Sequence, residues 1–264
     1  RTSSQAVAHS FEGHRVIAAI NGDVWAGFSN DMQDAPNGLD IEAGELVTAG
    51  TAGRPTFGVG ADGRPILGSP LVGVTLATAS MGQFVRNRVN QQRRSGEIVV
   101  YTPHFNTQTS SAASGIDVVI SGLALPLRPS GTWAGFVSTV RPSDGGWPLD
   151  PGTVVVTAPA SSALGAVLPG EPVTLTTTVP PGWESIQQAV GGREWIVRDG
   201  VTNISPHPAS ADEIHPRSAI GLTADGRLIL ATVDGREVGV SAGVRLPELA
   251  ALMKAQLERI AATE

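Results

Sequence analysis

The sequence predicts a sheet-rich α+β protein with a mixed or antiparallel core and few helices. Its 32 glycines and 19 prolines are scattered and separate short runs of β-branched residues, a pattern typical of antiparallel sheets. An apolar fraction of 41% beside 16% charged residues is that of a chain with a buried core. Its 264 residues suit one large domain or two small ones. We expect one domain over residues 1–264, with a β-rich subdomain inserted at residues 97–179.

Nine segments have the length and composition of strands, with turn-forming residues at their ends. They are residues 15–20, 71–78, 97–102, 116–121, 135–140, 152–158, 172–179, 218–223 and 228–233. Residues 83–94 are predicted to be a strand followed by a loop. The Asp-Gly pairs at Asp62, Asp225 and Asp234 predict tight turns, because both residue types tolerate the positive φ that hairpins require.

Two segments, residues 183–190 and 246–262, are predicted to be helical. In the second, Pro247 suits the first helical turn, where its missing N–H is not needed. Its apolar side chains recur at helical spacing on one face. They are Leu249, Leu252, Met253, Leu257 and Ile260. We expect this helix to pack against the sheet.

Composition limits the partners and the chemistry. The net charge of -6 and the pI near 5.4 argue against a nucleic-acid partner, because a polyanion is repelled by such a surface. Without cysteine the chain has no disulfide, thiolate metal site or cysteine nucleophile. No apolar run reaches the ~20 residues that cross a bilayer. Lys254 is the only lysine among many arginines, which fits a GC-rich bacterial source.

A first candidate site is Asn21-Gly22-Asp23, which directly follows a predicted buried strand. An amide and a carboxylate at the end of a strand lie at a sheet edge, where catalytic groups are often found. The alternative is an ordinary hairpin turn. Common catalytic signatures are absent: the sequence has no phosphate-binding glycine loop, no His-Glu-x-x-His and no serine elbow.

A second candidate site precedes the predicted strand at residues 218–223. Arg217 offers a planar set of donors that matches the oxygens of a phosphate. Its alternative role is structural, in an ion pair with a neighbour such as Asp212 or Glu213. His215 is a candidate proton carrier or a solvent-exposed histidine.

Two further groups contain turn-forming residues. Asp234 and Arg236 follow the strand at residues 228–233. One hairpin is expected to place them and Arg217 at opposite edges, unless the second strand pairs elsewhere. Gly191 and Gly192 allow a close backbone approach to a ligand, or end a helix.

These groups, in this order, resemble the phosphodiester glycosidase family over nearly the whole chain. The matching stretches are Ala-Ile-Asn-Gly-Asp at 19–23, Tyr-Thr-Pro at 101–103, Gly-Gly at 191–192, Val-Arg-Asp-Gly at 197–200, Pro-Arg-Ser-Ala-Ile-Gly at 216–221, Val-Asp-Gly-Arg at 233–236 and Leu-Pro-Glu-Leu-Ala at 246–250. Two differences stand out. The family has two aromatic residues where this chain has Val24 and Trp25, and its helix is followed by a strand and an Asn-Leu-Asp-Gly-Gly-Gly-Ser type of motif. Because the chain ends at Glu264, we expect an incomplete C-terminal part of the site, with a second fragment of the same polypeptide as a partner.

The resemblance implies a secreted or cell-envelope hydrolase that removes an N-acetylglucosamine-like sugar from a sugar-1-phosphodiester. In this interpretation Arg217 binds phosphate, Asp23 activates water or stabilises an oxocarbenium ion, and Asn21 holds the substrate. The residues expected around the substrate are Gly22, Gly191, Gly192, His215, Ser218, Asp234 and Arg236.

Two other functions stay open at this point. One is a non-catalytic module that binds a polysaccharide or cell-wall polymer, for which the five tryptophans offer sugar-stacking faces. The other is a phosphodiesterase that attacks phosphorus. No ligand spacing specifies a metal, and a divalent cation stays open because carboxylate and amide oxygens are hard ligands.

Overall fold

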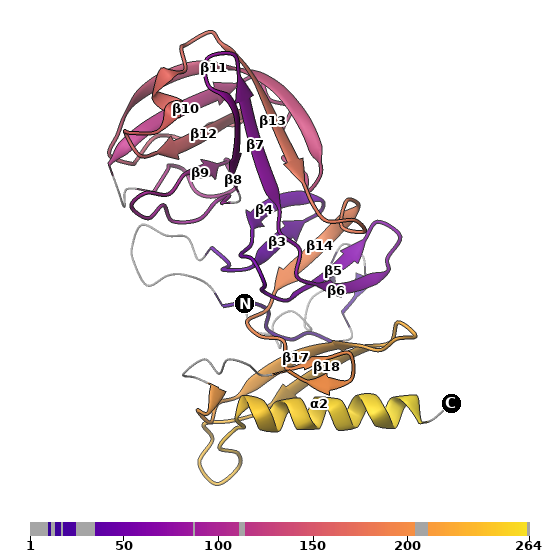
Figure 1. The fold of residues 1–264 in the computed structure, drawn as a ribbon. Helices are drawn as coiled ribbons and strands as arrows, with labels where there is room; N and C mark the ends of the chain where they lie inside the picture. The colour runs from indigo at the N-terminus through magenta and orange to yellow at the C-terminus, as the bar shows by residue number, and fades with distance from the viewer. Residues whose placement is uncertain are drawn as a thin grey trace. The chain divides into compact units, whose positions relative to one another are not determined.

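The computed structural model describes residues 10–11, 14–16, 18–24, 35–86, 88–110, 114–203 and 211–262 (Figure 1). Trp25 lies outside these ranges. The predicted sheet-rich α+β fold is confirmed, with α2 as the one α-helix of the described residues. That part of the chain holds no helix with the length and apolar character needed to span a membrane.

Two compact units make up the chain. The larger unit comprises Asp23–Gly63 and Gly68–Gly191. The smaller unit comprises Arg1–Gly22, Arg64–Leu67 and Gly192–Glu264. The insertion predicted at residues 97–179 lies within the larger unit, and its status as a separate subdomain stays a prediction.

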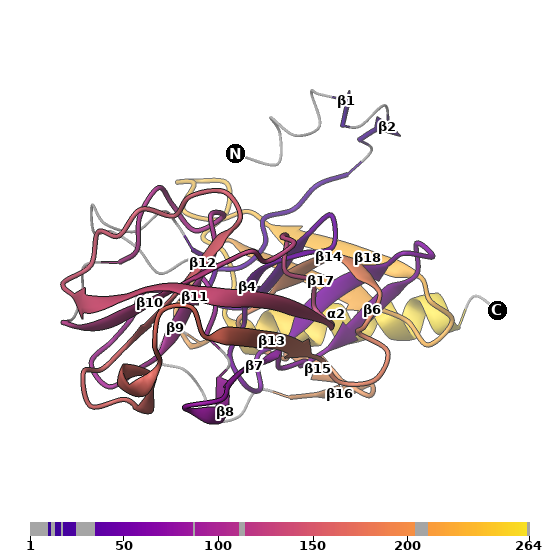
Figure 2. The same cartoon turned by 90° about the horizontal axis from the view of Figure 1, so that it is seen from above.

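The larger unit contains an antiparallel seven-stranded sheet with the order β8-β7-β13-β11-β10-β12-β9. Its strands are β7 (Gly73–Thr78), β8 (Gly82–Arg86), β9 (Val99–Tyr101), β10 (Gly115–Ser121), β11 (Gly131–Ser143), β12 (Thr153–Ala158) and β13 (Pro172–Thr178). The sheet curls into a half-barrel, with β10 and β11 running side by side (Figures 1 and 2). An isolated parallel bridge from Val89 to Val100 brings the segment after β8 onto β9. A short 3-10 helix, η1 (Ala163–Ala166), follows β12.

Buried and more exposed side chains alternate along the strands of this sheet. In β7 the side chains of Val74 and Leu76 are buried, whereas Thr75 between them is half-buried. In β13, Val173 and Leu175 are buried and Thr174 is exposed. Successive strand residues point to opposite faces, so one row of each strand enters the core and the other faces outward.

A smaller sheet has the order β4-β3-β14-β5-β6. Its strands are β3 (Leu39–Glu42), β4 (Glu45–Ala49), β5 (Thr56–Gly60), β6 (Pro65–Gly68) and β14 (Ile186–Gly191). The prediction of a helix at residues 183–190 is therefore wrong. The apolar residues Trp183, Ile186 and Val190 recur at a helical spacing, yet β14 pairs with β3 on one side and β5 on the other. Hydrogen bonding to two strands overrides the local periodicity, and a bulge between Ile186 and Gln188 shifts the register.

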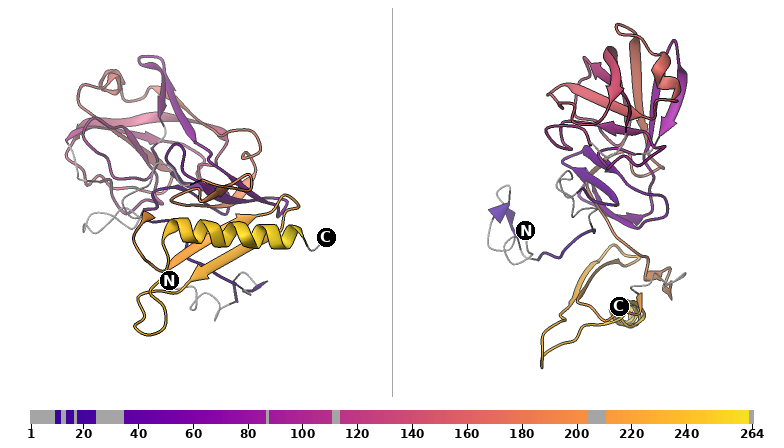
Figure 3. Two further views of the ribbon diagram at one scale, coloured as in Figure 1. Left: turned by 60° about the horizontal axis from the view of Figure 1, so that its bottom comes forward. Right: turned by 90° about the vertical axis from the view of Figure 1, so that its left-hand side faces the viewer.

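The smaller unit is built around a hairpin and a helix, β17 (Arg217–Leu222), β18 (Leu228–Val233) and α2 (Leu246–Ala261). Figure 3 shows α2 running along this hairpin. Leu249 and Met253 are buried against Ala219, Ile229 and other apolar residues of the sheet. The predicted packing of the C-terminal helix on a sheet is confirmed. Two short hairpins complete the unit, β1 (Ser10–Phe11) with β2 (His14–Arg15), and β15 (Val197–Arg198) with β16 (Val201–Thr202).

Two local predictions in this unit need correction. The strand predicted at residues 15–20 ends at Arg15 among the described residues, because β2 pairs with β1 only through His14 and Arg15. The tight turn predicted at Asp234 is also wrong. Gly235 instead packs closely, since a Cβ there would lie 2.7 Å from Pro216 N and 2.9 Å from Gly243 Cα. The chain reverses further on, between Glu237 and Ser241, which form a bridge.

The other two Asp-Gly turns are confirmed. Gly63 and Gly226 have φ values of +76° and +85°, and they lie between β5 and β6 and between β17 and β18. Residues 83–94 form β8 and then a loop, as predicted, with position 87 outside the described residues.

Candidate functional site

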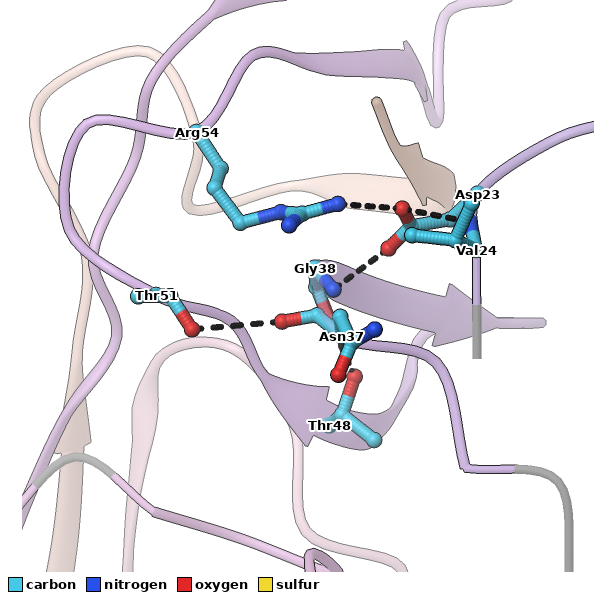
Figure 4. Close-up of polar contacts among 7 residues, drawn as sticks. All are labelled: Asp23, Val24, Asn37, Gly38, Thr48, Thr51 and Arg54. Atoms are coloured by element: carbon cyan, nitrogen blue, oxygen red, sulfur yellow. Dashed lines mark hydrogen bonds and ion pairs between the residues drawn. The ribbon is translucent and has the colours of Figure 1, made fainter. Parts of the chain in front are cut away.

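In the larger unit, the carboxylate of Asp23 is held by three donors (Figure 4). Oδ1 accepts hydrogen bonds from Arg54 Nη2 at 2.5 Å and from Val24 N at 2.7 Å. Oδ2 accepts from Gly38 N at 2.5 Å. The side chain is only 3% exposed, and that of Arg54 is 20% exposed. These contacts fix the carboxylate in one orientation beside a guanidinium group.

The carboxylate rests on a close crossing of two backbone segments. A Cβ on Gly191 would lie 2.6 Å from Gly38 Cα and 2.8 Å from Asp23 Oδ2, so neither glycine can carry a side chain without a shift of the backbone. Thr48 of β4 donates a hydrogen bond of 2.6 Å to the carbonyl of Gly38 and fixes the crossing from the other side. The close approach expected at Gly191 is thus made to this chain's own backbone and to Asp23. The alternative, a helix end, is wrong because Gly191 ends strand β14.

In the smaller unit, polar side chains gather where β17 begins and β18 ends. Arg217 Nε donates to the carbonyl of Val244 at 3.3 Å, and its Nη2 donates to the carbonyl of Glu213 at 2.7 Å. Arg236 Nη2 donates to His215 Nδ1 at 2.9 Å. The other ring nitrogen of His215 lies 2.7 Å from Glu213 Oε2. His215 is half-buried between these two partners.

Positive charge accumulates around Arg217. Burial lowers the pKa of Arg217, and the neighbouring positive charges of Arg193 and Arg236 lower it further, while Glu213 opposes the shift. We call Arg193, Arg217 and Arg236 the arginine cluster. Like charges at such a site favour an anion that can bridge them.

The expected separation of Arg217 from the Asp234 region is wrong. Arg217 pairs with Val233, so the first residue of β17 and the last residue of β18 lie at the same end of the hairpin. Antiparallel pairing requires this placement, because the strand that leaves the turn returns to the start of its partner. Asp234 and Arg236 follow Val233 directly and therefore join Arg217.

The structure sorts the predicted site residues into two sets. Asp23 and Gly191 meet in the larger unit. His215, Arg217 and Arg236 meet in the smaller unit. The remaining predicted residues also lie in the smaller unit, and they are Asn21, Gly22, Gly192, Ser218 and Asp234. Asn21, Gly22, Ser218 and Asp234 are exposed.

Several residues of these sites, among them Gly38, Arg54 and Arg193, were not singled out from the sequence. Gly38 and Arg54 belong to segments without a recognisable motif, and only the fold brings them to Asp23. Arg193 directly follows Gly191-Gly192, so its position in the sequence next to a predicted site could have identified it as a candidate.

A further acidic group lies near Asp23 on β3. Burial raises the pKa of Asp40 to about 6, with the negative charges of Glu42 and Asp23 acting in the same direction and His104 opposing them. Among the residues that the structure describes, no three His, Asp or Glu side chains are grouped so that they could hold a metal ion.

Comparison with known proteins identifies the class. The sequence profile of the phosphodiester glycosidase family matches residues 131–262, half of the chain. These residues include β17, β18 and the whole arginine cluster. The chain belongs to the phosphodiester glycosidase family. No curated protein matches it.

Two solved structures share the fold. A hypothetical protein from Synechocystis superposes with a TM-score of 0.66 at 19% identity, and the match covers 88% of this chain and 43% of that one. A Burkholderia pseudomallei protein thought to be exported gives a TM-score of 0.63 at 18% identity, covering 88% of this chain and 56% of that one. The chain thus spans about half the length of these two proteins.

Proposed function

We propose that the protein hydrolyses a sugar-1-phosphodiester, releasing an N-acetylglucosamine-like sugar and a phosphate monoester. The observation that carries this proposal is the arginine cluster, which lies within the part of the chain that matches the family. The guanidinium groups of Arg217 and Arg236 at one end of the hairpin, with the positive charge of Arg193 acting on Arg217, suit the oxygens of a phosphate. Export, proposed from the sequence, is consistent with the description of the Burkholderia relative.

The chemistry of the substrate explains why arginines suffice on the phosphate side. A phosphate monoester is a weak base and leaves readily, so its departure needs charge stabilisation more than protonation. Arg217 is our candidate for this role, because its guanidinium is oriented by two backbone carbonyls. Hydrogen-bond donors that are already oriented stabilise the charge that develops on the leaving phosphate, and they lower the activation barrier because they need not reorganise during the reaction.

On the sugar side, we keep Asp23 as the candidate carboxylate for water activation or oxocarbenium stabilisation, and Asn21 as a substrate ligand. The contacts of Asp23 also support a second role, in which its carboxylate stabilises the crossing of Gly38 and Gly191. The two roles differ in their effect on kcat and on stability, and a pair of variants separates them.

The test of the phosphate role is Arg217→Ala, with Arg227→Ala as the matched control at the opposite end of the same hairpin. We expect kcat/KM on a sugar-1-phosphodiester to fall by about 100-fold or more in Arg217→Ala. The control should retain its activity, and both variants should remain folded. Full activity in folded Arg217→Ala would remove this residue from the site.

A further inference from the structure

The hydrogen bonds around His215 show how the charges of the arginine cluster are distributed. A guanidinium group can only donate, so His215 Nδ1 must accept from Arg236. The ring proton is therefore on Nε2, which donates to the carboxylate of Glu213. Glu213 offers its side chain to the histidine, while its backbone carbonyl accepts from Arg217.

A net positive charge results. The charged groups that act on Arg217 are Arg193, Arg236 and Glu213. With Arg217 itself this makes three guanidinium groups, against the carboxylates of Glu213 and of the adjoining Asp234, which leaves one net positive charge. Arg217 is half-buried, and two backbone carbonyls hold its guanidinium in place. Arg193 and Arg236 are exposed to solvent.

The two phosphates of the proposed reaction differ in charge. A phosphodiester has one ionisable oxygen and carries a single negative charge. A phosphate monoester has a second pKa of roughly 6 and is doubly charged above it. It also presents three terminal oxygens to donors, one more than the diester. Charge and oxygen count therefore both favour the monoester at a site with a net positive charge and several N–H donors.

We propose that the arginine cluster binds a doubly charged phosphate monoester more tightly than a phosphodiester, so that the released phosphate product inhibits the enzyme by competing with its substrate. The inhibition rests on the proposed function, whereas the preference between the two phosphates rests only on the cluster. The group recognised is the terminal phosphate, whatever its alkyl substituent.

Binding is measured directly with two small probes, methyl phosphate and dimethyl phosphate, by calorimetric titration of the full-length protein at pH 8. We expect methyl phosphate to bind at least about tenfold more tightly, the size of one additional charge-assisted hydrogen bond. Arg193→Ala and Arg236→Ala should each weaken the binding of methyl phosphate by about tenfold and the binding of dimethyl phosphate by less. Arg227→Ala should change neither.

The same probes in a hydrolysis assay test the inhibition. Methyl phosphate should raise the KM for a sugar-1-phosphodiester and leave kcat unchanged, whereas dimethyl phosphate at the same concentration should have little effect. Equal binding of the two probes, or unchanged binding in both variants with folding intact, would overturn the inference even in an active enzyme. Preferential methyl phosphate binding by a protein without hydrolytic activity would support the cluster as a phosphate site and count against the proposed function alone.

Discussion

At the residue scale, Asp23 and Arg54 form the ion pair on which the Gly38 crossing depends. The carboxylate is nearly completely buried and bonded to two backbone N–H groups as well as to the guanidinium. Removing one partner of such a pair leaves the other charge poorly compensated, which destabilises a fold far more than the loss of an exposed pair does.

Asp23→Asn and Arg54→Ala separate structure from catalysis. Both should lower the free energy of unfolding by about 2–4 kcal/mol, measured by denaturant titration, whereas Asp62→Asn at an exposed turn should change it by less than about 0.5 kcal/mol. If Asp23 contacts the substrate, kcat of the folded Asp23→Asn protein falls by about 100-fold and that of Arg54→Ala falls much less. Equal kcat losses in the two variants would assign Asp23 to positioning alone.

Asp40 makes stability depend on pH in a predictable direction. Its folded pKa of about 6 lies above the ordinary aspartate value of 3.8, so the folded protein binds an extra proton between about pH 4 and pH 6. Stability should therefore decrease as the pH rises through this window. Asp40→Asn, which cannot ionise, should be more stable than the parent at pH 7 and equally stable at pH 3.5. If the difference in stability between Asp40→Asn and the parent is the same at both pH values, Asp40 does not have a raised pKa in the folded protein.

At the scale of the elements, the best predicted segments are those in which pattern and pairing agree. β18 has the predicted bounds, because its residues alternate and the turn at Asp225-Gly226 fixes the hairpin register. β14 was mistaken for a helix, because the spacing of its apolar residues fits a helix and its partners lie far away in the sequence. The turn between β15 and β16 lies at Asp199-Gly200, with φ values of +51° and +73°, and an Asp-Gly pair is itself a sequence signal for such a turn.

Helix α2 offers a test of the core of the smaller unit. Leu249 is 2% exposed and packs in the cluster with Met253, whereas Leu252 is 50% exposed on the same helix. Leu249→Ala should lower the free energy of unfolding by about 2–5 kcal/mol, because it creates a cavity. Leu252→Ala should change it by less than about 1 kcal/mol. Similar losses in the two variants would contradict the packing of α2 on β17 and β18.

At the scale of the whole molecule, the sequence predicted the family and the fold class but not the grouping of the site. Composition and turn residues were enough for a sheet-rich fold, and ordered motifs were enough for the family. The division of the candidate residues between two units was not visible, because Gly22 and Asp23 are adjacent in the sequence yet belong to different units. The contacts of Asp23 with Arg54 and Gly38 were not visible in the sequence either, because they depend on the tertiary structure.

The proposed function requires that the bond between the sugar and the phosphate oxygen break as water adds to the anomeric carbon. The most direct measurement is hydrolysis of an N-acetylglucosamine-1-phosphodiester by the full-length protein in oxygen-labelled water, followed by mass spectrometry of both products. We expect the label in the sugar and none in the phosphate monoester. Label in the phosphate would show attack at phosphorus, and no turnover by the folded protein would favour a binding module; either result would contradict the proposed function.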